Sequence, residues 1–149
     1  MTEPTATGGP APVSPEVQAY VDDMARRRGY VLDYHKVMAR YDLPVLQAAN
    51  GLVGAAYLEQ RRLDRRTKEL IFVVSLTVMR AAKGHIQSHI RVALDLGLSP
   101  EEILEALEIS IPEAGVVAFQ HGFEAWKEVV GATGVEPTVA VHDATSDIS

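Results

Sequence analysis

The four residues 99–102, Ser-Pro-Glu-Glu, carry the strongest local structural signal in the chain. They form an S-x-x-E capping box with proline at the first helical position, where its missing N–H is not needed. Ser14, Pro15 and Glu16 form a similar helix start, and Gly29 follows a run of three arginines as a helix stop. These signals predict a chain organised as consecutive helices.

Other residues that begin or end helices extend this prediction along the chain. Proline, glycine and cap residues divide the chain into helices at about 14–28, 32–40, 44–60, 64–82, 85–96, 99–111 and 112–130. The apolar run 70–79 reads as a central buried helix, with a strand as the alternative because it is rich in β-branched and aromatic residues. No hairpin signal, period-2 alternation or long repeat is present. We predict an all-α bundle of about six or seven helices.

One domain accounts for most of the 149 residues. Residues 1–13 and 131–149 contain no aromatic side chain, and we expect them to be flexible tails around a helical domain at 14–130. The net charge is −6, and four of the acidic residues lie in these tails. Without a basic stripe, the chain is not expected to bind nucleic acid or an anionic membrane.

The chain contains no cysteine. This excludes disulfides, thiolate metal sites and every thiol-based redox mechanism. The N-terminus lacks the features of a signal peptide, and the run 70–79 is too short to cross a bilayer, for which about 20 apolar residues are needed. We therefore expect a cytoplasmic protein.

Four residues in the apolar half are candidates for chemistry. His85 and His89 stand four residues apart, so a helix projects both from one face at the border of the core. His121 is in helical phase with small alanines, and Glu69 opens the buried run, where a carboxylate is costly unless it is paired or functional. A mostly apolar, metal-free pocket where the three histidines meet would suit an organic anion.

Structural interpretations remain open for the same residues. The histidine pair can be two ordinary partly buried residues, or metal ligands with His121, although H-x-x-x-H alone is a weak zinc signal. Glu69 can instead form a buried ion pair with Arg66, Lys68 or Arg80.

The remaining expectations concern burial. Three aromatic residues are expected in the core: Phe119, Phe123 and Trp126. His35 is expected at the surface, His142 in a tail, and the arginine run 26–28 at a solvated helix end.

Three segments together resemble a known family. They are L-D-R-R-T-K-E-L-I at 63–71, G-H-I-Q-S-H-I-R-V-A-L at 84–94 and L-G-L-S-P-E-E-I-L-E-A at 96–106, followed by P-E-A-G-V at 112–116. Over roughly 42–130 the chain resembles the carboxymuconolactone decarboxylase family, which belongs to the all-helical superfamily of the alkylhydroperoxidase AhpD. The resemblance implies an AhpD-like fold and rings of three subunits, often paired into hexamers.

The resemblance also bears on the activity. The peroxidase branch carries C-x-x-C before a histidine, and alignment on His89 places Ala82 and His85 at the two cysteine positions. Thiol peroxidase chemistry is thus excluded, and the cysteine-free decarboxylase branch, whose histidine matches His89, is implied. The tryptophan-rich segment of typical decarboxylases is replaced by Ala-Ala-Tyr at 55–57.

The implied activity is a lyase of aromatic compound catabolism that needs no cofactor. It would remove CO2 from an unsaturated carboxylated lactone or a related ring-cleavage product. We assign His89 as the proton donor, Glu69 as the group that orients an imidazole, and His85 and His121 as substrate-orienting or charge-stabilising groups. A lyase, isomerase or hydrolase without CO2 loss, a metal-dependent enzyme using the histidines, and a non-enzymatic helical oligomer are the alternatives. The abundant apolar helix faces further predict a homo-oligomer, with the pocket near a subunit interface.

Overall fold

The computed structural model describes residues 12–132, and every regular element in this range is a helix. The helices are α1 (Pro15–Arg28), α2 (Asp33–Tyr41), α3 (Leu43–Val53), the π-helix η1 (Gly54–Leu58), α4 (Arg65–Val78), α5 (Lys83–Asp95), α6 (Pro100–Glu108), α7 (Ser110–Ala114) and α8 (Val116–Val130). The all-α prediction is confirmed, and the run 70–79 is helical. Most of the two predicted tails lies outside the described residues.

The helix starts follow the cap signals of the sequence. The backbone N–H of Glu102 donates to the hydroxyl of Ser99 at 3.1 Å, and the Glu102 carboxylate accepts from the Ser99 N–H at 2.7 Å. Asp64 caps α4 by accepting from the N–H of Thr67 at 2.7 Å. These hydrogen bonds satisfy N–H groups that a helix end leaves unpaired.

Two predicted helices are interrupted. The helix expected at 44–60 changes at Gly54 into η1, whose wider turn carries the buried Tyr57. The last helix breaks at Gly115, which has φ 88° and separates α7 from α8. Glycine adopts this left-handed backbone without the strain that a Cβ brings, so the break falls there.

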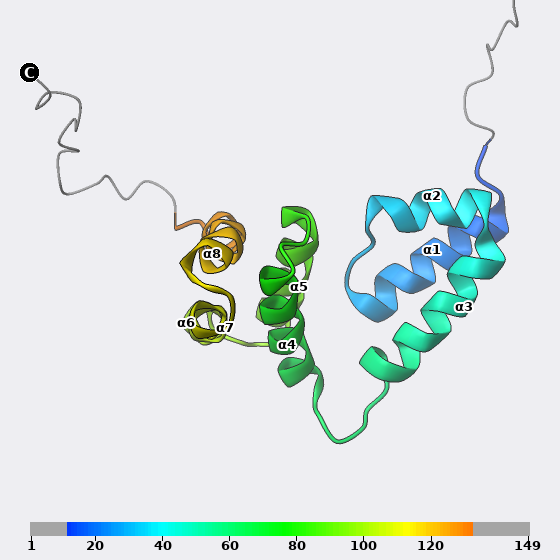
Figure 1. Cartoon of the computed structure of the whole chain (residues 1–149). Helices are drawn as coiled ribbons and strands as arrows, with labels where there is room; N and C mark the ends of the chain where they lie inside the picture. Colours follow the sequence, from blue (N-terminus) through cyan, green and yellow to red (C-terminus); the bar gives the residue numbers. More distant parts are fainter. Residues whose placement is uncertain (1–11, 133–149) are drawn as a thin grey trace, which may run out of the picture.

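Helices α4 to α8 form the main bundle around α4 (Figure 1). Its core contains buried residues from four of these helices and from the turn before α6: Val73, Leu76, Ile86, Ile90, Ala93, Leu98, Ile103, Leu107, Ala125 and Trp126. Phe119 and Phe123 pack against this core, so the three predicted core aromatics are confirmed. Helices α4 and α8 approach so closely at Gly122 that a Cβ there would overlap the side chain of Thr77.

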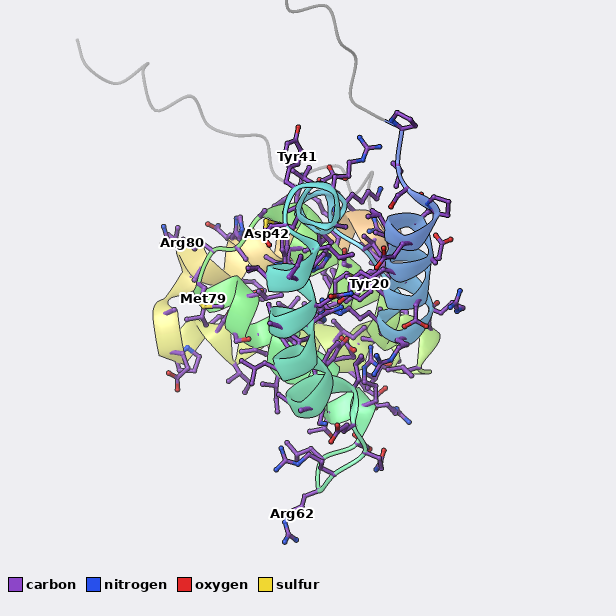
Figure 2. The ribbon with its side chains drawn as sticks, turned by 90° about the vertical axis from the view of Figure 1, so that its right-hand side faces the viewer. Tyr20, Tyr41, Asp42, Arg62, Met79 and Arg80 are labelled. Carbon is purple, nitrogen blue, oxygen red and sulfur yellow. The ribbon has the colours of Figure 1, made fainter. Side chains whose placement is uncertain are left out.

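Helices α1 to α3 form a second group, with Met24, Ala39 and Leu46 in its own small core. Figure 1 shows this group facing α5 and joined to the bundle by the loop at 59–64. Arg62 lies at the tip of that loop and points away from the helices, whereas Tyr20 lies between α1 and α3 (Figure 2). No helix within residues 12–132 is long and apolar enough to cross a membrane.

Candidate active site

A buried carboxylate and a buried imidazole meet between α4 and α5. Glu69 and His89 are both 0% exposed, and Nδ1 of His89 lies 2.7 Å from Oε2 of Glu69. Glu69 stands one helical turn after the start of α4, and His89 lies in the middle of α5. The adjacent helices thus bring together two of the residues singled out in the sequence.

The second carboxylate oxygen of Glu69 accepts from two further donors. The hydroxyl of Tyr57 and Nε of Arg65, at 2.7 Å, both donate to Oε1. Arg65 also donates to the Tyr57 hydroxyl at 2.7 Å, and its guanidinium carbon lies 4.1 Å from the centre of the Tyr57 ring. A buried carboxylate is stable only with such partners.

The expected ion-pair partner of Glu69 was wrong. Arg65, four residues earlier on the same helix, forms the pair, whereas Lys68 donates to the backbone carbonyls of Tyr57 and Glu59. Arg66 instead lies 3.7 Å from Glu102. The i, i+4 spacing places Arg65 on the face of α4 that carries Glu69, and neighbours in sequence lie on other faces.

The surroundings of Glu69 decide its ionisation. Burial alone would raise the pKa of Glu69, but the hydrogen bonds from His89, Tyr57 and Arg65 outweigh burial and lower it. Burial and the Glu69 carboxylate both raise the pKa of Tyr57. Near neutral pH the group therefore contains an ionised carboxylate and a neutral phenol that donates to it.

The orientation of the His89 ring follows from its neighbours. Nδ1–H donates to the ionised Glu69, which leaves Nε2 as the ring nitrogen that Glu69 does not hold. The hydroxyl of Tyr30 lies 3.2 Å from Nε2, and Phe72 stacks on the imidazole with ring centres 4.4 Å apart. Tyr30 and Phe72 thus fix the position of the imidazole edge and face that Glu69 does not contact.

His85 lies next to the ring of His89. Its ring centre is 5.3 Å from that of His89 and 6.4 Å from that of Tyr30, and the side chain is half-buried. Burial, together with His89 and the charge of Arg28, lowers the pKa of His85. His85 is therefore neutral near pH 7 and retains one N–H donor.

The structure gives His121 different neighbours. Its Nε2 donates to the carbonyl of Ala81 at 2.7 Å, in the turn between α4 and α5. The hydrogen bonds and ring contacts that join Tyr30, His85 and His89 in the described part of the chain do not include His121. The expected meeting of three imidazoles is therefore observed for two of them.

Arg28 and His35 were wrongly expected to be solvated. Arg28 is 5% exposed and His35 is 1% exposed, because the turn at Gly29 folds α2 back over the end of α1. Burial and the neighbouring Arg28 lower the pKa of His35 to about 4. The signal available in the sequence was the helical phase of His35 with the apolar Ala39. His142 lies outside the described residues.

A polar cavity of about 260 Å³ opens beside Arg28. It lies between α1, α3 and η1, and its lining includes Tyr20, Arg27, Arg28, Gln47 and Asn50. The lining of this cavity does not include His85, His89 or His121, so it is a different place from the pocket expected around the histidines. Arg28 connects it to the catalytic candidates, since its backbone carbonyl accepts from Arg65 at 2.8 Å.

The histidines do not fit a metal site. Nδ1 of His89 is committed to Glu69, and Nε2 of His121 is committed to a backbone carbonyl. Within residues 12–132 no group of three or more histidine, aspartate or glutamate side chains is arranged to hold a metal ion. Metal ligation requires at least three such donors to converge, so no step below is assigned to a metal.

Together, the fold and site define an all-helical protein with a buried carboxylate–histidine pair. The model of the carboxymuconolactone decarboxylase family matches residues 44–128, which is more than half of the chain. The chain therefore belongs to this family. Comparison with curated proteins and with solved structures gave no match. Glu69, His89, His85 and Tyr57 lie inside the matched segment, whereas Arg28 and Tyr30 precede it.

Proposed function

We propose that the protein is a cofactor-independent lyase that decarboxylates an unsaturated carboxylated lactone or a related product of aromatic ring cleavage. The buried Glu69–His89 pair, with Nε2 of His89 facing Tyr30 and the ring of His85 beside it, is the observation that carries this proposal. The family supports the reaction type, and the geometry supports the roles of the residues.

The reaction breaks the bond between the carboxylate carbon and the lactone. Its electron pair passes into the conjugated lactone to give an enolate while CO2 leaves, and a proton then adds to carbon. His89 in its protonated form donates that proton from Nε2, and Glu69 stabilises the imidazolium before transfer through its contact at 2.7 Å. Solvent returns the proton, so one proton is consumed in each cycle.

Two neighbouring donors suit the negative charge that develops. The hydroxyl of Tyr30 lies 3.2 Å from Nε2 of His89, and burial raises the pKa of Tyr30, so this hydroxyl keeps its proton near neutral pH. His85 is neutral there and donates through one N–H. Fixed donors next to a developing oxyanion lower the barrier more than mobile water does.

The proposed site differs by one residue from the set of four residues expected from the sequence. It contains His89, Glu69 and His85, with Tyr30 added. His121 is left out because its Nε2 is committed to the carbonyl of Ala81.

The direct test is CO2 release from carboxymuconolactone, with His89→Gln as the variant and His121→Gln as the matched control. We expect His89→Gln to lower kcat at least about 10²-fold, the usual contribution of a general acid, with helical content unchanged by circular dichroism. Proton exchange or ring opening without CO2 would support a different lyase, an isomerase or a hydrolase. Unchanged turnover in His89→Gln would overturn the assignment.

We further propose that the protein works as a homo-oligomeric ring, a trimer or a hexamer built from trimers. Two separate apolar faces support this. One is a groove on α4, α6 and α7 that includes Ile71, Val78 and Ile109 together with Glu113. The other is the outer face of α2, where Val37 and Tyr41 are 54% and 83% exposed.

A ring requires two different surfaces on each copy, because every subunit contacts its neighbours head to tail. The charges suit such a contact. Lys36 and Arg40 border the α2 face, and Glu113 borders the groove on α4, α6 and α7. The α2 face of one copy therefore complements the groove of the next in both apolar surface and charge.

A further inference from the structure

Arg28 is a buried cation without an anionic partner. The residue is 5% exposed, and no aspartate or glutamate within residues 12–132 forms an ion pair with it. A guanidinium has five N–H donors, and Arg28 directs two of its nitrogens to Asn50 and His35. A buried charge is costly unless a counter-charge compensates it.

The contact between Arg28 and His35 brings two donors together. The backbone N–H of Leu32 donates to Nδ1 of His35 at 3.0 Å, so the proton of the neutral ring is on Nε2. That Nε2 faces Nη1 of Arg28 at 3.2 Å. Two N–H groups that face each other repel, and both can be satisfied by an oxygen atom that accepts from them at once.

The surrounding residues reinforce this polarity. Asn50 turns its carbonyl oxygen to Arg28 and donates through its amide nitrogen to the hydroxyl of Tyr20 at 2.7 Å. Arg28 and Asn50 line the cavity of about 260 Å³. Two acidic residues also line it: Asp23, whose carboxylate already pairs with Arg26 at 3.1 Å, and Glu59.

Arg28 is close in sequence to a residue that contacts the Glu69–His89 pair. Tyr30, two residues further on, reaches Nε2 of His89 at 3.2 Å. Burial raises the pKa of Tyr30, and the charge of Arg28 opposes that rise. The pKa of His85 is lowered by burial, by His89 and by Arg28. The guanidinium therefore acts on both side chains next to the candidate proton donor.

We propose that Arg28, with the Nε2–H of His35, binds a carboxylate group of the substrate at the cavity between α1, α3 and η1. This inference rests on the proposed function for the identity of the substrate, but not for the binding itself. A guanidinium fork matches the two oxygens of a carboxylate. Arg28 lines this cavity, whose volume of about 260 Å³ gives space for the body of a small organic acid.

The test compares two ligands that differ in one group. Sorbate carries a carboxylate on a short conjugated chain, and sorbamide carries an uncharged amide in its place. Their dissociation constants are measured by NMR titration with the wild-type protein, Arg28→Gln and Arg62→Gln. Arg62 is an exposed arginine at the tip of the loop at 59–64 and does not line the cavity, so it is a matched control.

We expect the wild type to bind sorbate at least about 10-fold more tightly than sorbamide, the scale of one charge-assisted hydrogen bond. Arg28→Gln is expected to remove that preference, and Arg62→Gln to keep it. Equal binding of the two ligands by the wild type, or an unchanged preference in Arg28→Gln, would overturn the proposal. So would no binding of sorbate at about 10 mM, which would half-saturate even a site with a Kd of that size.

Arg28→Lys covers the case in which Arg28→Gln does not fold. It keeps the charge but loses the fork, and we expect it to bind sorbate more weakly than the wild type while still preferring it to sorbamide. A crystal structure of the wild type with sorbate then locates the carboxylate, at Arg28 or elsewhere. If sorbate binding depends on Arg28 but no CO2 is released from carboxymuconolactone, only the proposed lyase activity is refuted. If CO2 is released but sorbate binding does not depend on Arg28, only this carboxylate subsite is refuted.

Discussion

Nδ1 of His89 lies 2.7 Å from Oε2 of Glu69, and neither side chain is exposed. The carboxylate fixes the tautomer and the direction of the imidazole, so Nε2 always faces Tyr30. Because Arg65 and Tyr57 hold the other oxygen of Glu69, the ring is positioned through three helical elements, η1, α4 and α5. As the proposed proton donor, an imidazole held in this way would need little reorganisation during the reaction.

Glu69→Gln is expected to lower kcat at least about 10²-fold, because the amide cannot stabilise the imidazolium that donates the proton. Steady-state CO2 release measures this change. Glu69→Asp, which keeps the charge, is expected to recover part of the activity. If Glu69→Gln retained the wild-type rate, Glu69 would have a structural role only.

Gly122→Ala is expected to destabilise the fold by about 1–3 kcal/mol, the usual cost of overpacking. A Cβ at this position would overlap Thr77 and lie 2.8 Å from the side chain of Leu107. Urea unfolding measures the loss. Gly84→Ala is the control, since nothing lies within 4 Å of a Cβ there; it should be neutral or stabilising. Equal stability of the two variants would show that α4 and α8 separate easily.

Stability is expected to fall as the pH drops from 6.5 towards 4. The pKa of His35 falls from 6.5 in the unfolded chain to about 4 in the folded protein. Between these values the unfolded state binds more protons, so the contribution of His35 is complete above pH 6.5 and is lost below it. Thermal unfolding at pH 7.5 and 5.5 measures the difference.

The variant His35→Gln should show a smaller drop in Tm between these two pH values than the wild type. His85→Gln is the comparison, because the pKa of His85 is also lowered and His35 remains in that variant. If the drop in His35→Gln equalled that of the wild type, the folded protein would accept a proton at His35 as readily as the unfolded chain does.

Met79→Lys and Tyr41→Lys are each expected to produce a smaller assembly than the wild type, measured by light scattering. The two residues lie on the two apolar faces and are 68% and 83% exposed. A lysine there places an ammonium ion inside a contact from which water is excluded. Leu63→Lys, in the loop before α4 and 48% exposed, is the control and should leave the assembly intact.

Mixing the two lysine variants separates a ring from a symmetric pair. In a ring, one Met79→Lys copy still offers its α2 face to the intact groove of a Tyr41→Lys copy, so a 1:1 dimer forms and does not grow further. A wild-type protein that is monomeric at micromolar concentration would refute the ring at once.

The helices could be predicted from the sequence because their signals are local. The capping residues Ser14 and Ser99 act within one turn, and each caps a helix as predicted. Glu69 and His89 could be singled out because burying a polar side chain in an apolar helical stretch is costly unless that side chain is paired or functional. Their contact depends on how α4 packs on α5, and no short-range signal encodes that packing.

Arg28 and Tyr30 could not be found in this way. Basic residues at the end of a helix usually stabilise its dipole while solvated, and this run of arginines reads as such. Arg28 is buried only because α2 folds back after Gly29 and α3 brings Asn50 against it. The wrong assignment of His35 has the same cause, since its partner is Arg28 on another helix.

The family match begins at residue 44, so the site is divided between a matched and an unmatched part of the chain. Glu69 and His89 lie in the first part, and Arg28 and Tyr30 lie in the second. We therefore expect mutations in the segment 28–35 to alter which acid binds, while the proposed proton-transfer residues Glu69 and His89 stay constant. For directed evolution of substrate selectivity, saturation libraries belong in the segment 28–35, with α4 and α5 left unchanged.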